Sequence, residues 1–467
     1  MQPTTPTVRT MARETGALIL LFAIACIPSI GQPIALSILI VMVFGRPTST
    51  FKSLVAGATV TFITITSVKL IGGGSLLSAG PKWILLLAAC ARSLVAEGRP
   101  TKIYGLLMKY WGLLTGVLVI NALFVSAVPS ISVFKTISFS LGLLCVIRLS
   151  MLTSDRNTEM LLFVSEMGTA VVILSLPLLP LDIGWSKIGG AYFNGIFYHP
   201  QGLGVFLVMT GVASFVSAFK LPQLQRELIM CGLAQWSMIY FTRCRTALVA
   251  VLLGGIVYII EVFIRGGKST RIRFVSVFSI IITVTGIGLA LMLFPNLRDS
   301  VALYIRKGNV EAFTSVEEGL AALSTGTRGA QITSDLDIIA EHPLLGYGFG
   351  VSPGSENYLD PNNVLLWGIP LSAPIEQGFL PLATIAQIGV VGSLFILPFL
   401  FSMYQSARRS SAEDAALFVI ILGVNFGEMV FFSFGSMGGL VWVMLVFLSV
   451  NGSMSGSNLE IYNWRSN

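Results

Sequence analysis

The chain has 467 residues, of which 54% are hydrophobic and 11% are charged, with a formal net charge of +7. Ordinary soluble domains carry about 25% charged residues, so this composition excludes a single large soluble core and predicts a polytopic membrane protein. The positive charge does not form basic runs interleaved with aromatic residues. This excludes nucleic acid as the expected partner and favours membrane lipid headgroups.

The apolar runs predict an all-α polytopic integral membrane protein with about 12–14 transmembrane helices, since each crossing needs roughly 20 mostly apolar residues. The runs lack the alternation that is typical of a lipid-facing β-barrel. In chain order they are 16–29, 33–45, 53–73, 82–97, 103–128, 131–149, 159–180, 202–219, 227–242, 246–264, 274–294, 379–402, 415–433 and 436–450. They divide the chain into N-terminal spans (1–294), one long polar loop (295–378), C-terminal spans (379–450) and a short tail (451–467).

Lysine and arginine gather in alternate short loops, and this bias predicts the orientation of the spans. If the N-terminus is cytoplasmic, most of the positive charge in short loops falls inside. Both termini are therefore expected to be cytoplasmic, and the 295–378 loop to be extracytoplasmic. Some arginines stay on the outer side against this rule, and the binding of an anion would explain them: Arg243, Arg245 and Arg328.

Arg243 and Arg245 lie between two apolar runs, in the segment Tyr240-Phe-Thr-Arg-Cys-Arg-Thr246. A guanidinium group is permanently charged and binds two phosphate oxygens at once. Arginine also rests at helix ends simply by extending its head group to water. Two arginines together, with Arg328 on the same face, favour a phosphate site.

The sequence pattern predicts a helix over residues 328–341, within the long loop. Pro343 is expected to end this helix. Its apolar face is expected to pack on the membrane domain and to hold, at steps of four, four and three, Arg328, Ile332, Leu336 and Ile339. The polar face is expected to point to water with Asp335, Asp337 and Glu341. Pairing of Arg328 with a neighbouring carboxylate is an equal alternative to a site role. Glycines 346, 348 and 350 predict a tight turn whose backbone passes close to a substrate or to another loop.

Glu376 precedes the apolar run that re-enters the membrane, and it is followed by Gln377. A partly desolvated carboxylate there has the character of a base that takes a proton from a hydroxyl group. An interfacial charge that caps a span is the simpler alternative. Glu428, toward the outer end of its span, is a further candidate for the site. No cluster has the ligand spacing of a metal site, so neither a metal ion nor another cofactor is expected.

Three segments in this order resemble the O-antigen ligase and polymerase (Wzy-like) superfamily, in the exopolysaccharide polymerase type. They are Phe193-Asn-Gly-Ile-Phe-Tyr-His-Pro-Gln-Gly-Leu-Gly204, then Thr242-Arg-Cys-Arg-Thr-Ala-Leu-Val-Ala250, and then Arg328 with the glycine turn, the Glu376 stretch and Gly389-Val-Val-Gly392. Together they cover about residues 190–400.

The resemblance implies a GT-C-like glycosyltransferase in the bacterial cytoplasmic (inner) membrane that polymerises polyprenyl-diphosphate-linked oligosaccharide repeat units into a surface polysaccharide. It implies that Arg245, with Arg243, and Arg328 bind the diphosphate and that Glu376 is the base of a metal-independent, inverting transfer. Glu428, His199 and Gln377 are candidates to support the site. A flippase and a chain-length regulator are the expected protein partners.

Two alternatives stay open. The first is ligase-type transfer of the lipid-linked glycan to an acceptor, although ligases of this superfamily typically have a His-Asn pair where this chain has Glu376-Gln377. The second, from another class, is a polysaccharide or lipid transporter or flippase. Transporters often show internal repeats and a site at the bilayer midplane, whereas the unusual feature here is one long outer loop.

Overall fold

A computed structural model describes residues 6–28, 30–63, 76–96, 102–153, 156–186, 192–265, 329–353, 365–366, 369–370, 379–427, 430–434 and 437–464. The described part is helical apart from two very short antiparallel pairs, β1 (Trp185–Ser186) with β2 (Tyr192–Phe193) and β3 (Leu365–Leu366) with β4 (Ile369–Pro370). The predicted helical fold is confirmed for these residues.

The α-helices follow the apolar runs closely. Before the long loop they are α1 (Val8–Ala25), α2 (Gly31–Val43), α3 (Pro47–Val60), α4 (Leu76–Val95), α5 (Lys102–Phe124), α6 (Pro129–Leu152), α7 (Asn157–Ser175), α8 (Pro200–Lys220), α9 (Gln225–Thr242) and α10 (Arg245–Arg265). After it begins they are α14 (Gly329–Glu341), α15 (Leu380–Ser410), α16 (Ala412–Gly423) and α17 (Met437–Trp464). The run 274–294 lies outside the described residues. The run 415–433 differs from the prediction, because its helix α16 ends at Gly423 and a single 3₁₀ turn follows.

Within the described residues, six helices are long and apolar enough to cross a membrane: Ile103–Phe124, Pro129–Leu152, Asn157–Leu178, Pro200–Lys220, Arg245–Arg265 and Leu380–Ser410. Gly31–Val43 and Met437–Val450 are shorter apolar helices. These features are those of a multi-pass membrane protein.

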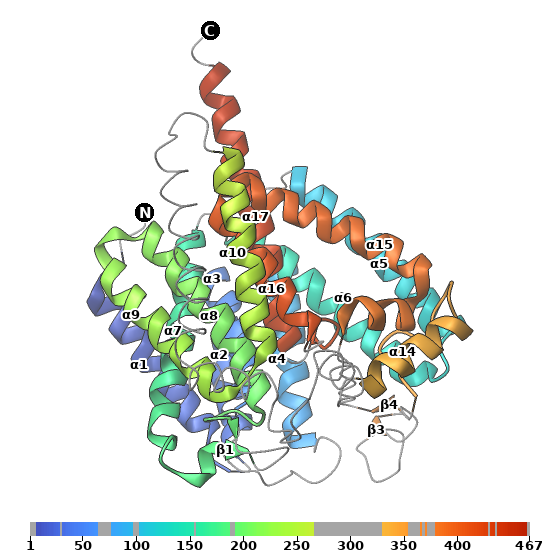
Figure 1. Cartoon of the computed structure of the whole chain (residues 1–467), viewed down its shortest axis with the longest axis horizontal. Coiled ribbons are helices and arrows are strands. Elements are labelled where there is room, and N and C mark those ends of the chain that lie inside the picture. Colours follow the sequence, from blue (N-terminus) through green and yellow to red (C-terminus); the bar gives the residue numbers. More distant parts are fainter. Residues whose placement is uncertain are drawn as a thin grey trace, which may run out of the picture.

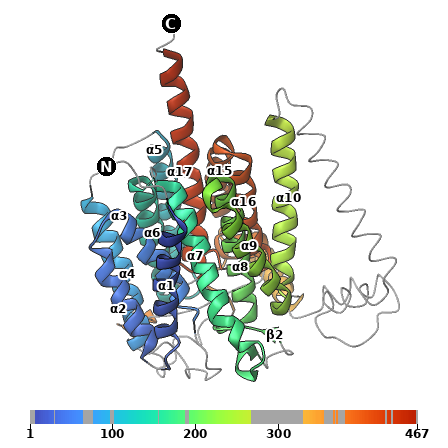
Figure 2. The same cartoon turned by 90° about the vertical axis from the view of Figure 1, so that its left-hand side faces the viewer.

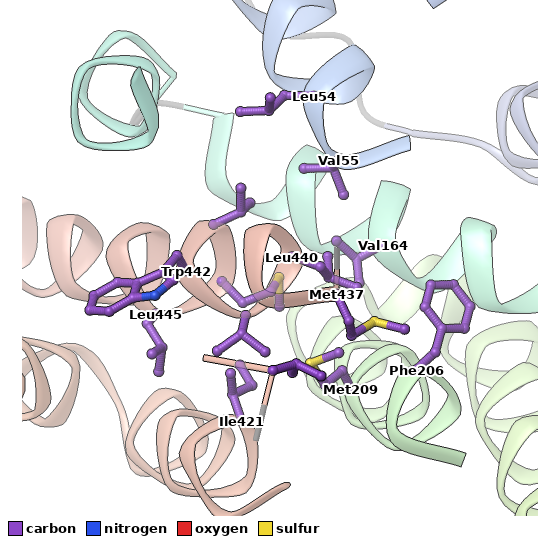
Figure 3. Close-up of a cluster of buried hydrophobic side chains, with 14 of the residues drawn as sticks. Leu54, Val55, Val164, Phe206, Met209, Ile421, Met437, Leu440, Trp442 and Leu445 are labelled. Atoms are coloured by element: carbon purple, nitrogen blue, oxygen red, sulfur yellow. The ribbon is translucent and has the colours of Figure 1, made fainter. Parts of the chain in front are cut away.

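The core is built around the first half of α17. Every residue from Leu440 to Leu448 is at most 1% exposed, as expected for a helix that is apolar on all sides. Figure 3 shows Met437, Leu440, Trp442 and Leu445 of α17 among side chains from α3, α7, α8 and α16. The indole N–H of Trp442 donates to the carbonyl of Phe431 at 2.7 Å, so this buried polar group is paired.

The ion pairs between described residues all lie at one end of the helix bundle. They gather where α1, α3, α7 and α16 begin and α8, α10 and α15 end; they include Lys52–Glu14, Lys220–Asp414 and Arg408–Glu261. The other end, where α6, α8, α10 and α15 begin, is here called the loop end. Figure 1 shows α14 and strands β1, β3 and β4 at the loop end, and Figure 2 shows α17 projecting from the opposite end.

Helix α15 is broken at Gly389, which has φ 67° and ψ −177°. The glycine turn fills the break: the N–H groups of Tyr347 and Gly348 donate to the carbonyls of Ala386 and Gln387 at 2.8 and 3.0 Å. In return, the N–H groups that follow the break, Val390 and Val391, donate to the carbonyls of Pro343 and Leu344 at 3.0 and 3.1 Å. The turn was predicted to pass close to a substrate or to another loop; the structure instead places it against the backbone of helix α15.

A single side chain anchors this turn in the core. Phe349 is fully buried, and its ring lies 5.6 Å from that of Phe139 and 5.1 Å from that of Phe432, edge to face in both pairs. Phe139 in turn contacts Trp442 of α17 at 5.4 Å. The glycine turn and α17 thus belong to one aromatic cluster.

We predict that Phe349→Ala lowers the stability of the purified protein by about 3–5 kcal/mol, because it opens a cavity inside this cluster. The neighbouring Leu344 is 64% exposed, so Leu344→Ala is the matched control and should change stability by no more than about 0.5 kcal/mol. Thermal unfolding in detergent measures both. Equal, small shifts for the two variants would show that the turn is not anchored by the ring.

Candidate functional site

Two of the sequence segments that suggested a function lie in direct contact at the loop end. Gly204 of α8 faces the turn between α9 and α10, where a Cβ atom on this glycine would lie 2.3 Å from Cβ of Cys244 and 2.9 Å from the hydroxyl of Thr242. The thiol of Cys244 lies 3.9 Å from the carbonyl of Gln201. The turn therefore packs on the first residues of α8, and only a glycine at position 204 allows this close approach.

Arg243 occupies the turn in a left-handed conformation, with φ 49°, which is uncommon for a residue other than glycine. Its guanidinium carbon lies 5.7 Å from the centre of the Tyr192 ring, in β2, at a distance typical of a cation–π contact. Thr242 fixes the turn, because its hydroxyl donates to the carbonyl of Ile239 and accepts from the N–H of Cys244. Arg243 is half-buried and held by local structure.

Arg245 is the first residue of α10 and is also half-buried. Helices α8 and α10 are packing neighbours, and both begin at this end. The N-terminus of a helix carries a partial positive charge. Two such ends beside two guanidinium groups produce a positive region that is suited to a phosphate or diphosphate.

His199 begins α8 as its N-cap, and its Nδ1 accepts the N–H of Gln201 at 3.3 Å. It lies beside the turn between α9 and α10 (residues 242–245), here called the arginine turn, because Gln201 contacts Cys244. This capping bond fixes the imidazole at the edge of the positive region.

The remaining predicted site residues, Arg328, Glu376, Gln377 and Glu428, lie outside the described residues. Their roles stay predictions. Within the described residues, no group of three or more His, Cys, Asp and Glu side chains gathers where a metal ion could bind.

The orientation predicted for α14 is wrong in part. Asp335, expected to face water, is 1% exposed, and Leu336, expected to pack inward, is 50% exposed. Asp335 and Ile338 form the buried positions of α14, which packs on α15. One carboxylate oxygen of Asp335 has no hydrogen-bond partner, and burial raises the pKa of this carboxyl from 3.8 to about 6.

Lys135 is a further buried charge that was not predicted as a site residue; it is 8% exposed and lies near the beginning of α6. The signal was present, because a lysine stands inside the apolar run 131–149, and charges in such runs are usually functional. Asp335 had no comparable signal, since its burial depends on how α14 lies on α15.

No protein-family model matches the chain, and no curated protein is similar to it in sequence. The resemblance to the Wzy-like superfamily therefore rests on its three segments, two of which the structure brings into contact.

We predict that Gly204→Ala displaces the arginine turn and lowers stability by about 1–3 kcal/mol, because the added methyl group collides with Cys244 and Thr242. Gly255 in α10 has no atom within 4 Å of the position that a Cβ would take. Gly255→Ala should therefore be neutral or stabilise the helix by up to about 1 kcal/mol. Thermal unfolding compares the two, and a loss of equal size in both would contradict the packing argument.

We predict that docking of α14 strengthens as the pH falls. The carboxyl of Asp335 has a pKa of 3.8 when α14 is undocked and of about 6 when it is docked. As the pH rises from 3.8 to about 6, ionisation of this carboxyl weakens docking progressively; above about pH 6 the loss is constant. From about pH 7 to about pH 5 the gain is roughly 1 kcal/mol. Helix α15 has no titratable side chain between residues 380 and 403. Among the described acidic and histidine side chains near Asp335, those of Asp337, Glu341 and His342 are exposed.

Hydrogen exchange of the α14 amides, corrected for the intrinsic pH dependence, measures this docking. Asp335→Asn should remove the pH dependence and protect α14 at pH 7, whereas Asp337→Asn, at an exposed position, should behave as the wild type. Protection that is independent of pH in the wild type would refute the prediction.

Proposed function

We propose that this protein is a glycosyltransferase of the bacterial cytoplasmic membrane that polymerises polyprenyl-diphosphate-linked oligosaccharide repeat units into a surface polysaccharide. The observation that supports it most is the arginine turn: Arg243 and Arg245 stand where two helices begin, at the end of the bundle that also holds α14 and the glycine turn. A diphosphate is the group that such a region binds best.

The proposal takes the loop end as the outer face, with both termini in the cytoplasm and about 12–14 spans of roughly 20 residues each. The distribution of ion pairs supports this orientation. Lys52, Lys220 and Arg408 all pair with carboxylates at the opposite end, and lysine and arginine are more abundant on the cytoplasmic side of membrane proteins.

The proposed reaction is one displacement at the anomeric carbon of the donor sugar. Glu376 takes the proton from the hydroxyl of the acceptor sugar as its oxygen attacks, and the bond from the anomeric carbon to the diphosphate oxygen breaks. The polyprenyl diphosphate leaves with the electron pair, and the configuration at the anomeric carbon inverts. Arg243, Arg245 and Arg328 stabilise the negative charge that grows on the leaving group.

The test uses purified protein, a polyprenyl-diphosphate-linked repeat unit and a gel of the glycan products. A ladder of chain lengths on the lipid carrier is the expected result. Transfer of intact glycan to an added lipid or protein acceptor, without a ladder, would instead identify a ligase. Absence of turnover, together with movement of the lipid-linked substrate across vesicle membranes, would identify a transporter or flippase.

We predict that Glu376→Gln lowers the rate of ladder formation at least about 100-fold, because an amide cannot accept the proton of the attacking hydroxyl. Glu341→Gln makes the same change at an exposed position of the same loop and should retain the wild-type rate. Both variants must elute as folded protein. A Glu376→Gln enzyme with full activity would exclude this residue as the base.

A further inference from the structure

Arg243 is in contact with a residue from a different part of the chain. Its guanidinium carbon lies 5.7 Å from the centre of the Tyr192 ring, and this tyrosine is only 3% exposed. Tyr192 belongs to β2, which packs on α9; Figure 2 shows β2 beside that helix. A cation–π contact uses the charge of the guanidinium group and none of its N–H donors. This contact therefore holds the group and leaves its donors for the oxygens of an anion.

A second tyrosine–arginine contact, at the opposite end of the bundle, is different in this respect. The guanidinium carbon of Arg148 lies 5.9 Å from the centre of the Tyr104 ring. The Arg148 guanidinium also donates to the hydroxyl of Tyr104 and to three backbone carbonyls near the end of α4. Its donors are thus used within the protein, as expected for a structural arginine. Among the described residues, no carboxylate pairs with Arg243.

The backbone at position 243 also indicates that the side chain matters. Arg243 has φ 49°, in the left-handed region where glycine and asparagine are favoured. It is the C-cap residue of α9, so a glycine at this position would allow the same turn with less strain. The arginine is therefore explained by its side chain rather than by the turn. Residues held in this conformation are frequent at functional sites.

Buried aromatic rings fix the strand that carries Tyr192. Neighbouring residues of a strand point to opposite faces. The ring of Phe193, which is fully buried, lies 5.4 Å from that of Trp185 in β1 and 6.5 Å from that of Phe241 in α9. The indole N–H of Trp185 donates to a backbone carbonyl at 2.9 Å. Strand β2 is thus anchored to β1 and to the last turn of α9, and Tyr192 reaches the arginine turn from a fixed position.

We propose that Tyr192 is a positioning residue of the arginine turn, which orders the Arg243 guanidinium before a diphosphate binds. This inference rests on the proposed function, because it assigns Tyr192 to the site that would bind the diphosphate of the donor. An arginine side chain that is already ordered loses less conformational entropy on binding, and this raises the affinity. Because the diphosphate is also the leaving group, a preordered guanidinium stabilises its growing charge without rearranging during the reaction.

Equilibrium binding of a radiolabelled polyprenyl diphosphate without sugar, to purified protein in a phosphate-free detergent, tests the assignment. Tyr192→Leu should weaken binding about tenfold, which corresponds to 1.4 kcal/mol. Tyr192→Phe keeps the ring and should bind within about twofold of the wild type. Tyr104→Leu removes the corresponding contact with Arg148 at the opposite end of the bundle and should bind as the wild type. Thermal unfolding establishes that each variant is folded.

A double-mutant cycle separates positioning from general support of the turn. If Tyr192 acts through Arg243, Tyr192→Leu should weaken binding no further once Arg243→Ala is present. Combined with Arg245→Ala, Tyr192→Leu should still weaken binding about tenfold. Full losses in both combinations would show that Tyr192 supports only the local fold, and would overturn the assignment.

Two replacements of Arg243 test the role of its backbone conformation. Glycine adopts the left-handed conformation without strain, so Arg243→Gly should unfold at a higher temperature than Arg243→Ala. Both variants lose the guanidinium and should bind equally weakly. The reverse order of unfolding temperatures would contradict the left-handed turn on which the position of the guanidinium depends.

The outcomes separate this inference from the proposed function. Wild-type affinity in Tyr192→Leu, together with weak binding by Arg243→Ala, overturns the positioning role and leaves the proposed function intact. Wild-type affinity in Arg243→Ala excludes this arginine as a ligand, and the positioning role with it. Failure of the wild type to bind any polyprenyl diphosphate refutes the proposed function itself.

Discussion

The break in α15 is the constraint on which the loop end depends. In a membrane every backbone group must be paired within the protein, so the break at Gly389 requires partners for the N–H and C=O groups that the helix no longer pairs. The glycine turn supplies them through four backbone hydrogen bonds. Asn121 of α5 adds two more, donating to the carbonyl of Leu345 and accepting from the N–H of Phe349, both at 2.7 Å. The turn is therefore an internal part of the membrane domain.

This arrangement couples three features that are far apart in the sequence. The turn ends α14, so the docking of that helix depends on the break. It places Phe349 in the aromatic cluster that reaches Trp442, and so connects the loop end with the central helix. It also brings Gly350 onto the stem of Lys135. A change at any one of these contacts is therefore expected to affect the other two.

Hydropathy predicted the helices and their order, because burial in lipid demands long apolar segments whatever the tertiary structure. The arginine turn was also predictable, because Arg243 and Arg245 lie on the side of the membrane where lysine and arginine are expected to be rare. The break at Gly389 was not, because a glycine in an apolar run is equally compatible with an intact helix. The burial of Asp335 was missed because the face of a short amphipathic helix depends on its partner. Lys135 was detectable as a charge in an apolar run. The burial of the nearby Ser132 and Thr136 hydroxyls without hydrogen-bond partners was not, because it depends on the tertiary structure.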